Sequence, residues 1–191
     1  NDPSSIRYLV SRDTENLSES DINKAAIETY AENLSDGVIA PMFYLLVFGL
    51  VGLFLYKAVN TLDSMVGYRT QKYERFGKMS ARLDDILNYI PSRITAVILL
   101  ILFGKLGKLK QTWYYGRLHQ SPNAGYPIAA MALCLDVALG GPTSYFGSVK
   151  NKSYFGEGKR EITALDVRRA LALQWKLDTL LITLLIAGVL A

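Results

Sequence analysis

Residues 56–68 read Tyr-Lys-Ala-Val-Asn-Thr-Leu-Asp-Ser-Met-Val-Gly-Tyr. Their first residue, Tyr56, is also the last of nineteen consecutive residues, 38–56, that carry no charge. On a helix that continues through this stretch, Asn60 and Asp63 share one face and Lys57 lies beside them. An amide, a carboxylate and an ammonium group at the end of an apolar segment indicate a binding face rather than a lipid-facing one. The alternative is a polar collar at the membrane boundary, whose long side chains reach toward the head groups.

Hydrophobic residues make up 50% of the chain, and they cluster as they do in membrane proteins. Besides residues 38–56, apolar runs occupy residues 94–103 and 179–191. The first run has about the 20 residues needed for one crossing, although Pro41, Gly49 and Gly52 interrupt it. We therefore predict an all-α, polytopic membrane protein in the lipid bilayer, with broken or re-entrant helices joined by polar loops.

Charge and cysteine content exclude several other classes of protein. The chain has 21 basic and 17 acidic residues, and the basic ones are dispersed among the apolar runs, which argues against nucleic-acid binding. Cys134 is the only cysteine and His119 the only histidine, so the sequence contains no disulfide framework and no metal motif built on cysteines or paired histidines. The apolar surroundings of Cys134 predict a core residue rather than a nucleophile.

Polar boundaries divide the chain into predicted helices. Ser18 and Asp21 have the spacing of a capping box and open a helix that we expect Asp36-Gly37 to stop. A second, amphipathic helix is predicted over residues 81–90, with Pro91 ending it.

The segment after residue 118 is richer in prolines and glycines. Residues 119–127 contain two prolines and a glycine and should form a rigid loop rather than a helix. This loop displays His119, Ser121 and Asn123. A short apolar helix at about residues 128–138 follows, and the glycine-rich residues 139–147 are predicted to bring backbone N–H groups close to a ligand. Thr163 with Asp166 opens a last helix that should anchor the chain.

Carboxylates gather in two of these helices. Glu28, Glu32 and Asp36 are spaced by four, and like charges at this spacing repel unless a cation lies between them. Asp84 and Asp85 form a second pair beside an amide. Such a pair suits a hard divalent cation such as Mg²⁺, which takes one or two carboxylates together with phosphate oxygens. The alternative is that both sets are ordinary solvated helix surfaces.

Six sets of residues, in order along nearly the whole chain, form a recognisable series. They are Val10-Ser-Arg-Asp-Thr14, Ala31-Glu-Asn-Leu-Ser-Asp-Gly37, residues 56–68, Leu83-Asp-Asp85 with Asn88 and Ile90-Pro-Ser-Arg93, Ser121-Pro-Asn-Ala-Gly125, and Leu139-Gly-Gly-Pro142. This series resembles the successive motifs of the adenosylcobinamide-phosphate synthase family.

The resemblance implies an acid–amine ligase of the cobalamin pathway that is a multi-pass protein of the cell (inner) membrane. Such an enzyme joins the corrinoid adenosylcobyric acid to aminopropanol or its phosphate, forming an amide with ATP and Mg²⁺. Family members are longer at the N-terminus, so we expect residues 1–191 to be a single membrane-embedded catalytic region in the C-terminal two-thirds or so of the protein. The resemblance leaves open a homo-oligomer or a complex with later membrane enzymes of the pathway.

Activation of a carboxylate needs metal, cationic donors and a proton acceptor, and these needs assign roles to the motif residues. The expected catalytic residues are Glu32, Lys57, Asp63 and Asp85. The expected substrate- or phosphate-binding residues are Arg12, Asp13, Asn33, Asn60, Asn88, Arg93, His119, Ser121 and Asn123. The expected metal ligands are Glu28, Glu32, Asp36, Asp84 and Asp85. One activated intermediate must meet metal, phosphate and amine within a few ångströms, so we predict that one cavity collects the following polar residues: Glu32, Lys57, Asn60, Asp63, Asp85 and Asn123.

Three residues depart from the family's pattern after His119: Gln120 replaces a proline, Ile128 a glutamate and Leu133 a glycine. The change at position 128 removes a carboxylate from beside the expected site, and we interpret the chain as a divergent member. Two other functions stay open, a membrane sensor of the same superfamily linked to β-lactamase induction, and a transporter. The retained Asn60-Thr-Leu-Asp63 and Ser121-Pro-Asn123 favour the synthase.

Overall fold

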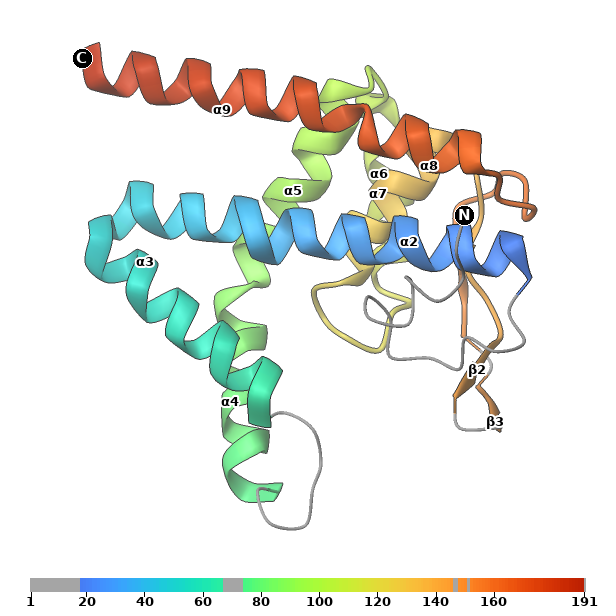
Figure 1. The fold of residues 1–191 in the computed structure, drawn as a ribbon, viewed down its shortest axis with the longest axis horizontal. Helices are drawn as coiled ribbons and strands as arrows, with labels where there is room; N and C mark the ends of the chain where they lie inside the picture. The colour runs from blue at the N-terminus through green and yellow to red at the C-terminus, as the bar shows by residue number, and fades with distance from the viewer. Residues whose placement is uncertain (1–17, 67–73, 146–147, 151, 191) are drawn as a thin grey trace.

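A computed structural model describes residues 18–66, 74–145, 148–150 and 152–190 of the chain (Figure 1). The described part is mostly helical, which confirms the helical prediction, but it also contains short strands that we did not predict. The predicted site residues Arg12 and Asp13 lie outside the described residues.

The first described helix, α2 (Glu19–Asn33), begins as predicted, because the Ser18 hydroxyl accepts a hydrogen bond from the Asp21 backbone N–H (3.2 Å). The predicted stop at Asp36-Gly37 is wrong. The chain widens there into a π-helical turn, η1 (Leu34–Ile39), and continues into α3 (Ala40–Val66). Gly37 does not adopt the left-handed conformation with which glycine commonly ends a helix, so its weak helix propensity is overridden.

α3 is broken at Gly49, where φ is 65° and ψ is −160°. Only glycine adopts this backbone conformation without strain. The chain reverses direction at this point, so the first arm of α3 (residues 40–48) prolongs the line of α2 and the second arm (residues 50–66) folds back beneath it (Figure 1). This break confirms the prediction of a broken helix over residues 38–56.

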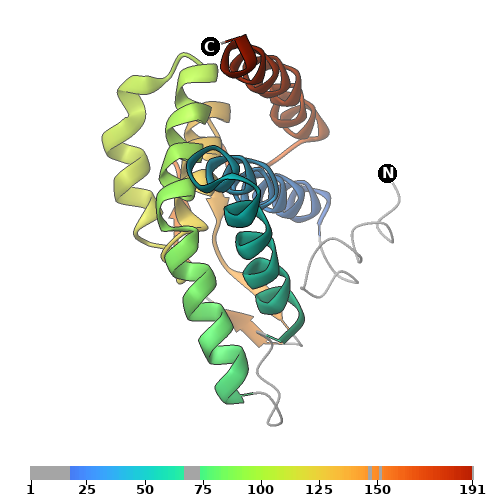
Figure 2. The ribbon, with the colours of Figure 1, turned by 90° about the vertical axis from the view of Figure 1, so that its left-hand side faces the viewer.

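α4 (Glu74–Leu87) and α5 (Tyr89–Leu102) form one path that bends by 45° at Asn88. The prediction that Pro91 ends this helix is wrong, because Pro91 lies in the first turn of α5 and helical hydrogen bonds continue on both sides of it. The second arm of α3 runs alongside α4 (Figure 2).

The core is built around α7 (Gly125–Leu135), in which every residue is buried. It packs against α2, α5 and α6 (Leu109–Gly116), which follows a 3₁₀ turn, η2 (Leu106–Lys108). The rigid loop predicted to reach residue 127 ends earlier, because residues 125–127 form the first turn of α7, a position that accepts proline. Cys134 is buried here as predicted, and burial raises the pKa of its thiol to about 12.

The C-terminal part begins with two short antiparallel pairs, β1 (Leu139–Gly140) with β4 (Tyr154–Phe155), and β2 (Thr143–Tyr145) with β3 (Ser148–Lys150). α8 (Ala164–Leu171) then opens with the predicted capping box between Thr163 and Asp166. α9 (Leu173–Leu190) follows and extends away from the core (Figure 1).

By length and composition, the described residues offer one helical segment able to cross a membrane, Glu19–Met65, and a second if the bent pair α4–α5 is taken as one span. Only 17% of the most apolar window of the first segment is buried, unlike the core helix of a soluble protein. The residues around the Gly49 reversal are among the most exposed large apolar side chains: Leu46, Val47, Phe48, Leu50, Val51, Phe54 and Leu55. These features fit a lipid-facing helical hairpin, whereas a multi-pass topology stays a prediction.

Candidate functional site

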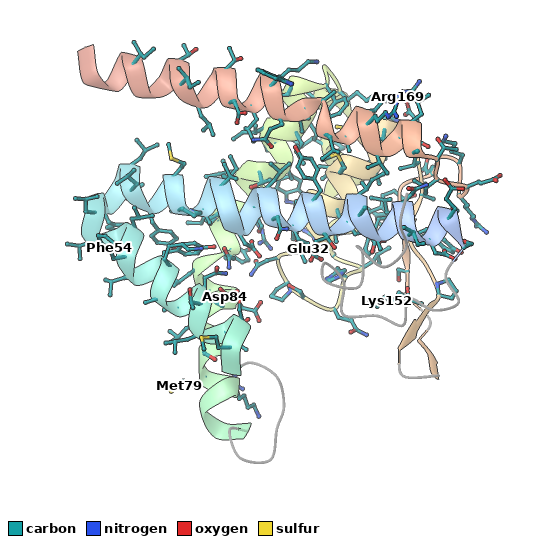
Figure 3. All side chains as sticks on the ribbon, in the orientation of Figure 1. Glu32, Phe54, Met79, Asp84, Lys152 and Arg169 are labelled. Carbon is teal, nitrogen blue, oxygen red and sulfur yellow. The ribbon has the colours of Figure 1, made fainter. Side chains whose placement is uncertain are left out.

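Asp84 on α4 is the centre of a polar network between the second arm of α3 and the α4–α5 bend (Figure 3). Its Oδ1 accepts a hydrogen bond from Asn60 Nδ2 (3.2 Å), and its Oδ2 accepts one from Asn88 Nδ2 (2.9 Å). The carboxylate therefore ties α3 to α4 and to the residue at which the α4–α5 path bends.

Tyr56 extends the network to η1. Its hydroxyl lies 2.9 Å from the backbone carbonyl oxygen of Asp36 and 2.9 Å from Asn88 Oδ1, and its side chain is 1% exposed. Both ends of the Asn88 amide are thus engaged within the protein, and Asn88 is itself 1% exposed. This arrangement indicates that Asn88, predicted as a substrate ligand, holds its neighbours in place.

Several carboxylates share this region. Asp36 on η1, Asp63 on α3 and Asp85 on α4 each interact electrostatically with Asp84, and Lys57 lies near enough to Asp36 to offset part of its charge. Asp63 Oδ1 is buried and has no hydrogen-bond partner within the described residues. Carboxylates gathered in this way favour a bound cation, because their mutual repulsion is strong where water is scarce.

The loop before α7 closes over the same region through Asn123. The Asn123 Nδ2 donates to the backbone oxygen of Asp85 (2.7 Å) and approaches its carboxylate (3.4 Å). Arg93 holds the other end of the Asn123 amide, because its Nη1 donates to Asn123 Oδ1 (2.9 Å) while its Nη2 donates to the Pro122 carbonyl (3.0 Å).

The guanidinium of Arg93 is also stacked against two aromatic rings. Its central carbon lies 3.7 Å from the ring centre of Tyr89 and 4.0 Å from that of Tyr126. Arg93, predicted to bind phosphate, is therefore the clamp that fixes the loop against α5.

Two other predicted ligands in this loop also have structural contacts. Ser121 Oγ accepts hydrogen bonds from the backbone N–H groups of Asn123 (3.2 Å) and Ala124 (3.3 Å), so it supports the turn that enters α7. His119 Nδ1 accepts one from the Ser121 backbone N–H (3.0 Å). Burial and nearby Lys152 lower the pKa of His119, which favours a neutral imidazole at pH 7.

Some predicted residues lie apart from the network. Glu28 is buried, and its Oε1 accepts a hydrogen bond from the Gly140 backbone N–H (2.7 Å). The N–H group that we expected to face a ligand is thus bonded to a side chain. Glu32 is half-buried on the side of α2 that faces Asp84 in Figure 3, and Asn33 is exposed.

Within the described residues, no group of three or more His, Cys, Asp or Glu side chains is placed to hold a metal ion by itself. Of the predicted ligands, Asp36, Asp84 and Asp85 lie in the network, whereas Glu28 does not. Mg²⁺ often takes only one or two protein carboxylates and completes its shell with water and phosphate oxygens. Carboxylate oxygens, including the unpartnered Oδ1 of Asp63, are the donor type that Mg²⁺ prefers, so the chemistry of these residues is compatible with such an ion.

A cavity of about 430 Å³ lies elsewhere, on α6, lined by Leu109, Lys110, Trp113, Tyr114 and Arg117. None of the predicted site residues lines it.

The three residues that depart from the family pattern lie in ordinary environments. Gln120 is exposed, while Ile128 and Leu133 belong to α7 and are buried in the core. A carboxylate at position 128 would be buried at this point, so isoleucine suits the packing.

The sequence reasoning missed the roles of two tyrosines, Tyr44 and Tyr56. Tyr44 Oη donates to the Leu87 carbonyl oxygen (2.9 Å), and its ring stacks on that of Tyr56 with centres 5.1 Å apart. Prolines inside helical segments could have indicated these roles. Each such proline has no N–H to donate, so one backbone carbonyl of the preceding turn needs a donor from elsewhere.

Residues 3–174 match the family model described as "CobD/Cbib protein". This chain belongs to the CobD/CbiB family. It is 47% identical over 174 residues to the cobalamin biosynthesis protein CobD of Halalkalibacterium halodurans, covering 88% of this chain and 54% of that protein. It is 43% identical over 188 residues to the cobalamin biosynthesis protein CbiB of Salmonella typhimurium, covering 96% and 59%.

The chain therefore spans a little over half the length of these relatives. No solved structure matches the chain. Membership of the family was predicted from the motifs and is confirmed.

Proposed function

We propose that the full-length protein containing this chain acts in cobalamin biosynthesis as an acid–amine ligase. Its reaction is the ATP-dependent joining of adenosylcobyric acid to aminopropanol or its phosphate. The observation that carries the proposal is the meeting of Asp36, Asn60, Asp84 and Asn123 in one network, although they lie on separate segments of the chain. The names of the relatives, cobalamin biosynthesis proteins CobD and CbiB, support the pathway.

The proposed chemistry begins with a carboxylate that must be activated, commonly as an acyl phosphate. Mg²⁺, when bound, would offset the charge of the phosphoryl group, and we assign Asp36, Asp84 and Asp85 to hold it. We assign Lys57, which is exposed beside Asp36, to pair with a phosphate oxygen.

Amide formation then requires a proton acceptor. The amine nitrogen bonds to the acyl carbon, phosphate leaves, and the nitrogen gives up a proton. We assign that proton to Asp63, because its buried Oδ1 has no hydrogen-bond partner within the described residues. Half-buried Glu32 is the alternative acceptor.

We also propose that the protein is embedded in the cell membrane, with the hairpin around Gly49 facing lipid. A corrinoid and an amino alcohol would then reach the acid network from the polar end of the hairpin. A homo-oligomer or a complex with later membrane enzymes of the pathway fits this placement.

The proposal is tested on the full-length protein in detergent. ATP breakdown should require both adenosylcobyric acid and aminopropanol or its phosphate, and the amide product should be detected by mass. Asp63→Asn and Asp85→Asn should abolish product formation while leaving expression intact. Asp136→Asn is the matched control, because Asp136 is exposed and forms an ion pair with Lys105, which is not a residue of the acid network.

Wild-type turnover by the Asp63 and Asp85 variants would reduce these residues to solvated helix-surface acids. A folded wild-type protein without substrate-dependent ATP breakdown would favour the sensor of the same superfamily instead.

A further inference from the structure

Two prolines interrupt the hydrogen-bond ladders of the helices that carry the acid network. Around Pro91 the ladder continues on both sides, from the Asn88 N–H to the Asp84 oxygen (2.9 Å) and from the Ser92 N–H to the Asn88 oxygen (3.0 Å). The missing rung is the one that Pro91, which has no N–H, would donate to the Leu87 oxygen.

The same situation occurs in the π-helical turn η1. There the Ala40 N–H donates to the oxygen five residues back, that of Ser35. The next rung in this register would run from residue 41 to the Asp36 oxygen, but residue 41 is Pro41. Each proline thus leaves one backbone carbonyl without its helical donor.

At each of these carbonyls, a tyrosine hydroxyl lies where it can replace the missing backbone donor. Tyr44 Oη donates to the Leu87 oxygen at 2.9 Å, and Tyr56 Oη lies 2.9 Å from both the Asp36 oxygen and Asn88 Oδ1, which share its one proton. The two rings lie on opposite sides of the Gly49 break and stack with an interplanar angle of 10°. Tyr44 therefore pins the first arm of the hairpin to the α4–α5 bend, and Tyr56 pins the second arm to η1.

These pins connect the segments that carry the acids: η1 with Asp36, the second arm of α3 with Asp63, and α4 with Asp84 and Asp85. We propose that Tyr44 and Tyr56 are positioning residues, which set the spacing of these carboxylates by satisfying the carbonyls that Pro91 and Pro41 leave open. The inference rests on the proposed function only for its catalytic consequence. The pinning itself is a statement about the fold.

Hydroxyl groups are needed here, and not rings alone, because a part-buried carbonyl left without a donor is destabilising. Phenylalanine would keep the stacked pair but leave the carbonyl unsatisfied. Replacing the proline with alanine restores a backbone N–H to the ladder and makes the hydroxyl dispensable. Each tyrosine should therefore be coupled to its own proline.

The test is a double-mutant cycle in the full-length protein in detergent, with Tyr44→Phe, Pro91→Ala and the two combined. Tyr44→Phe should lower Tm by about 2–6 °C in the wild-type background and by much less in the Pro91→Ala background. An equal loss in both backgrounds would overturn the inference. Tyr56→Phe with Pro41→Ala is an independent second cycle.

Spin labels give a measurement that does not depend on the proline variants. Cysteines replacing the exposed Leu62 on α3 and Leu83 on α4 report the distance between the two helices. This distribution should broaden in Tyr44→Phe and Tyr56→Phe, and an unchanged distribution in both would contradict the pinning. Tyr115→Phe is the control, because it loses only an exposed bond to Glu157 and should leave the distribution unchanged.

Activity separates the two proposals. If the wild-type protein forms the amide, the tyrosine variants should lose rate mainly in kcat, because the misplaced groups act on the reacting atoms. If the wild-type protein shows no ligase activity but the cycle and the distances behave as expected, the proposed function fails and the pinning stands. Unaltered kcat in variants with broadened distances would refute the positioning role.

Discussion

Asn60 Nδ2 donates a hydrogen bond of 3.2 Å to Asp84 Oδ1, across the interface between the second arm of α3 and α4. This contact joins a residue from the polar end of the apolar hairpin to the central acid of the network. It explains why an amide and not a second carboxylate suits position 60, since another negative charge would face Asp84 directly.

Replacing Asn60 with leucine should remove a donor from Asp84 without changing the side-chain volume much. We expect a loss of about 1–2 kcal/mol in stability, and a larger loss for Asn60→Asp, which adds a repelling charge. Thermal unfolding of the full-length protein in detergent measures both. Asn33→Leu on the exposed surface of α2 should change stability little, and a similar loss there would contradict the assignment.

Arg93→Lys should release the loop that carries Asn123. Lysine keeps the charge but has neither the planar fork that bonds Asn123 and Pro122 nor the flat face that stacks between two tyrosines. We expect a destabilisation of about 1–3 kcal/mol and faster proteolysis within residues 119–124. Arg168→Lys on the exposed side of α8 is the control. If Arg93→Lys and Arg168→Lys resist proteolysis in this loop equally well, Arg93 does not act as the clamp.

Gly49 and Gly37 form a matched pair for the backbone of the hairpin. An added Cβ would meet nothing within 4 Å at either position, but only Gly49 has a positive φ, 65°. Gly49→Ala should therefore destabilise the reversal by about 1–3 kcal/mol, whereas Gly37→Ala should be neutral or stabilising by up to about 1 kcal/mol. Unfolding measurements on the two variants decide this, and equal effects would mean that the break is not set by φ.

Asp166 predicts a pH dependence of stability outside the candidate spans. Burial alone would raise the pKa of Asp166, but hydrogen bonds from Lys159 and Thr163 outweigh it and hold this pKa below its usual value. A carboxyl whose pKa is lowered by folding stabilises the protein above its unfolded pKa, about 3.9, and this stabilisation is lost as the pH falls through the folded value.

Asp166→Asn should therefore cost about 1–2 kcal/mol at pH 7, by weakening the cap of α8 and the ion pair with Lys159. The wild type and the variant should converge as the pH falls below about 4. Denaturant unfolding across this range measures the difference, and a gap that is independent of pH would contradict the linkage.

The exposed hairpin predicts the behaviour of residues 1–191 when they are produced alone. The large apolar side chains around Gly49 are 55–70% exposed, so the isolated region should aggregate without detergent. We also expect it to lack the proposed activity, because it spans only a little over half the length of its relatives. Light scattering and chromatography test the first point, and a soluble, monodisperse, detergent-free monomer would overturn the membrane prediction.

Local sequence signals predicted the two capped helix starts and the broken hairpin, whereas the helix expected to begin at residue 81 begins at Glu74. Ser18 and Thr163 cap their helices as expected, because a cap acts within a single turn and needs no distant partner. The break over residues 38–56 was also visible in advance, since glycine and proline act on their own backbone. The motifs identified the family for the same reason, because each is a short local string of residues.

Helix ends were harder to predict. Asp36-Gly37 and Pro91 were expected to stop helices, but the chain continues through both. A tertiary donor removed the penalty at Pro91, where Tyr44 satisfies the carbonyl of Leu87. That donor lies 43 residues away in the sequence, so no local pattern reveals it.

The tertiary structure alone decided which polar residues face the site and which support it. Asn88 and Arg93 have the residue types of ligands, yet their contacts hold a helix bend and a loop. Glu28 lies about one helical turn before Glu32, yet its side chain accepts a hydrogen bond from the Gly140 backbone N–H. Sequence determines which chemical groups are present and their order, but a hydrogen bond needs atoms within about 3 Å, and only the packing of the broken helices brings distant segments to that distance.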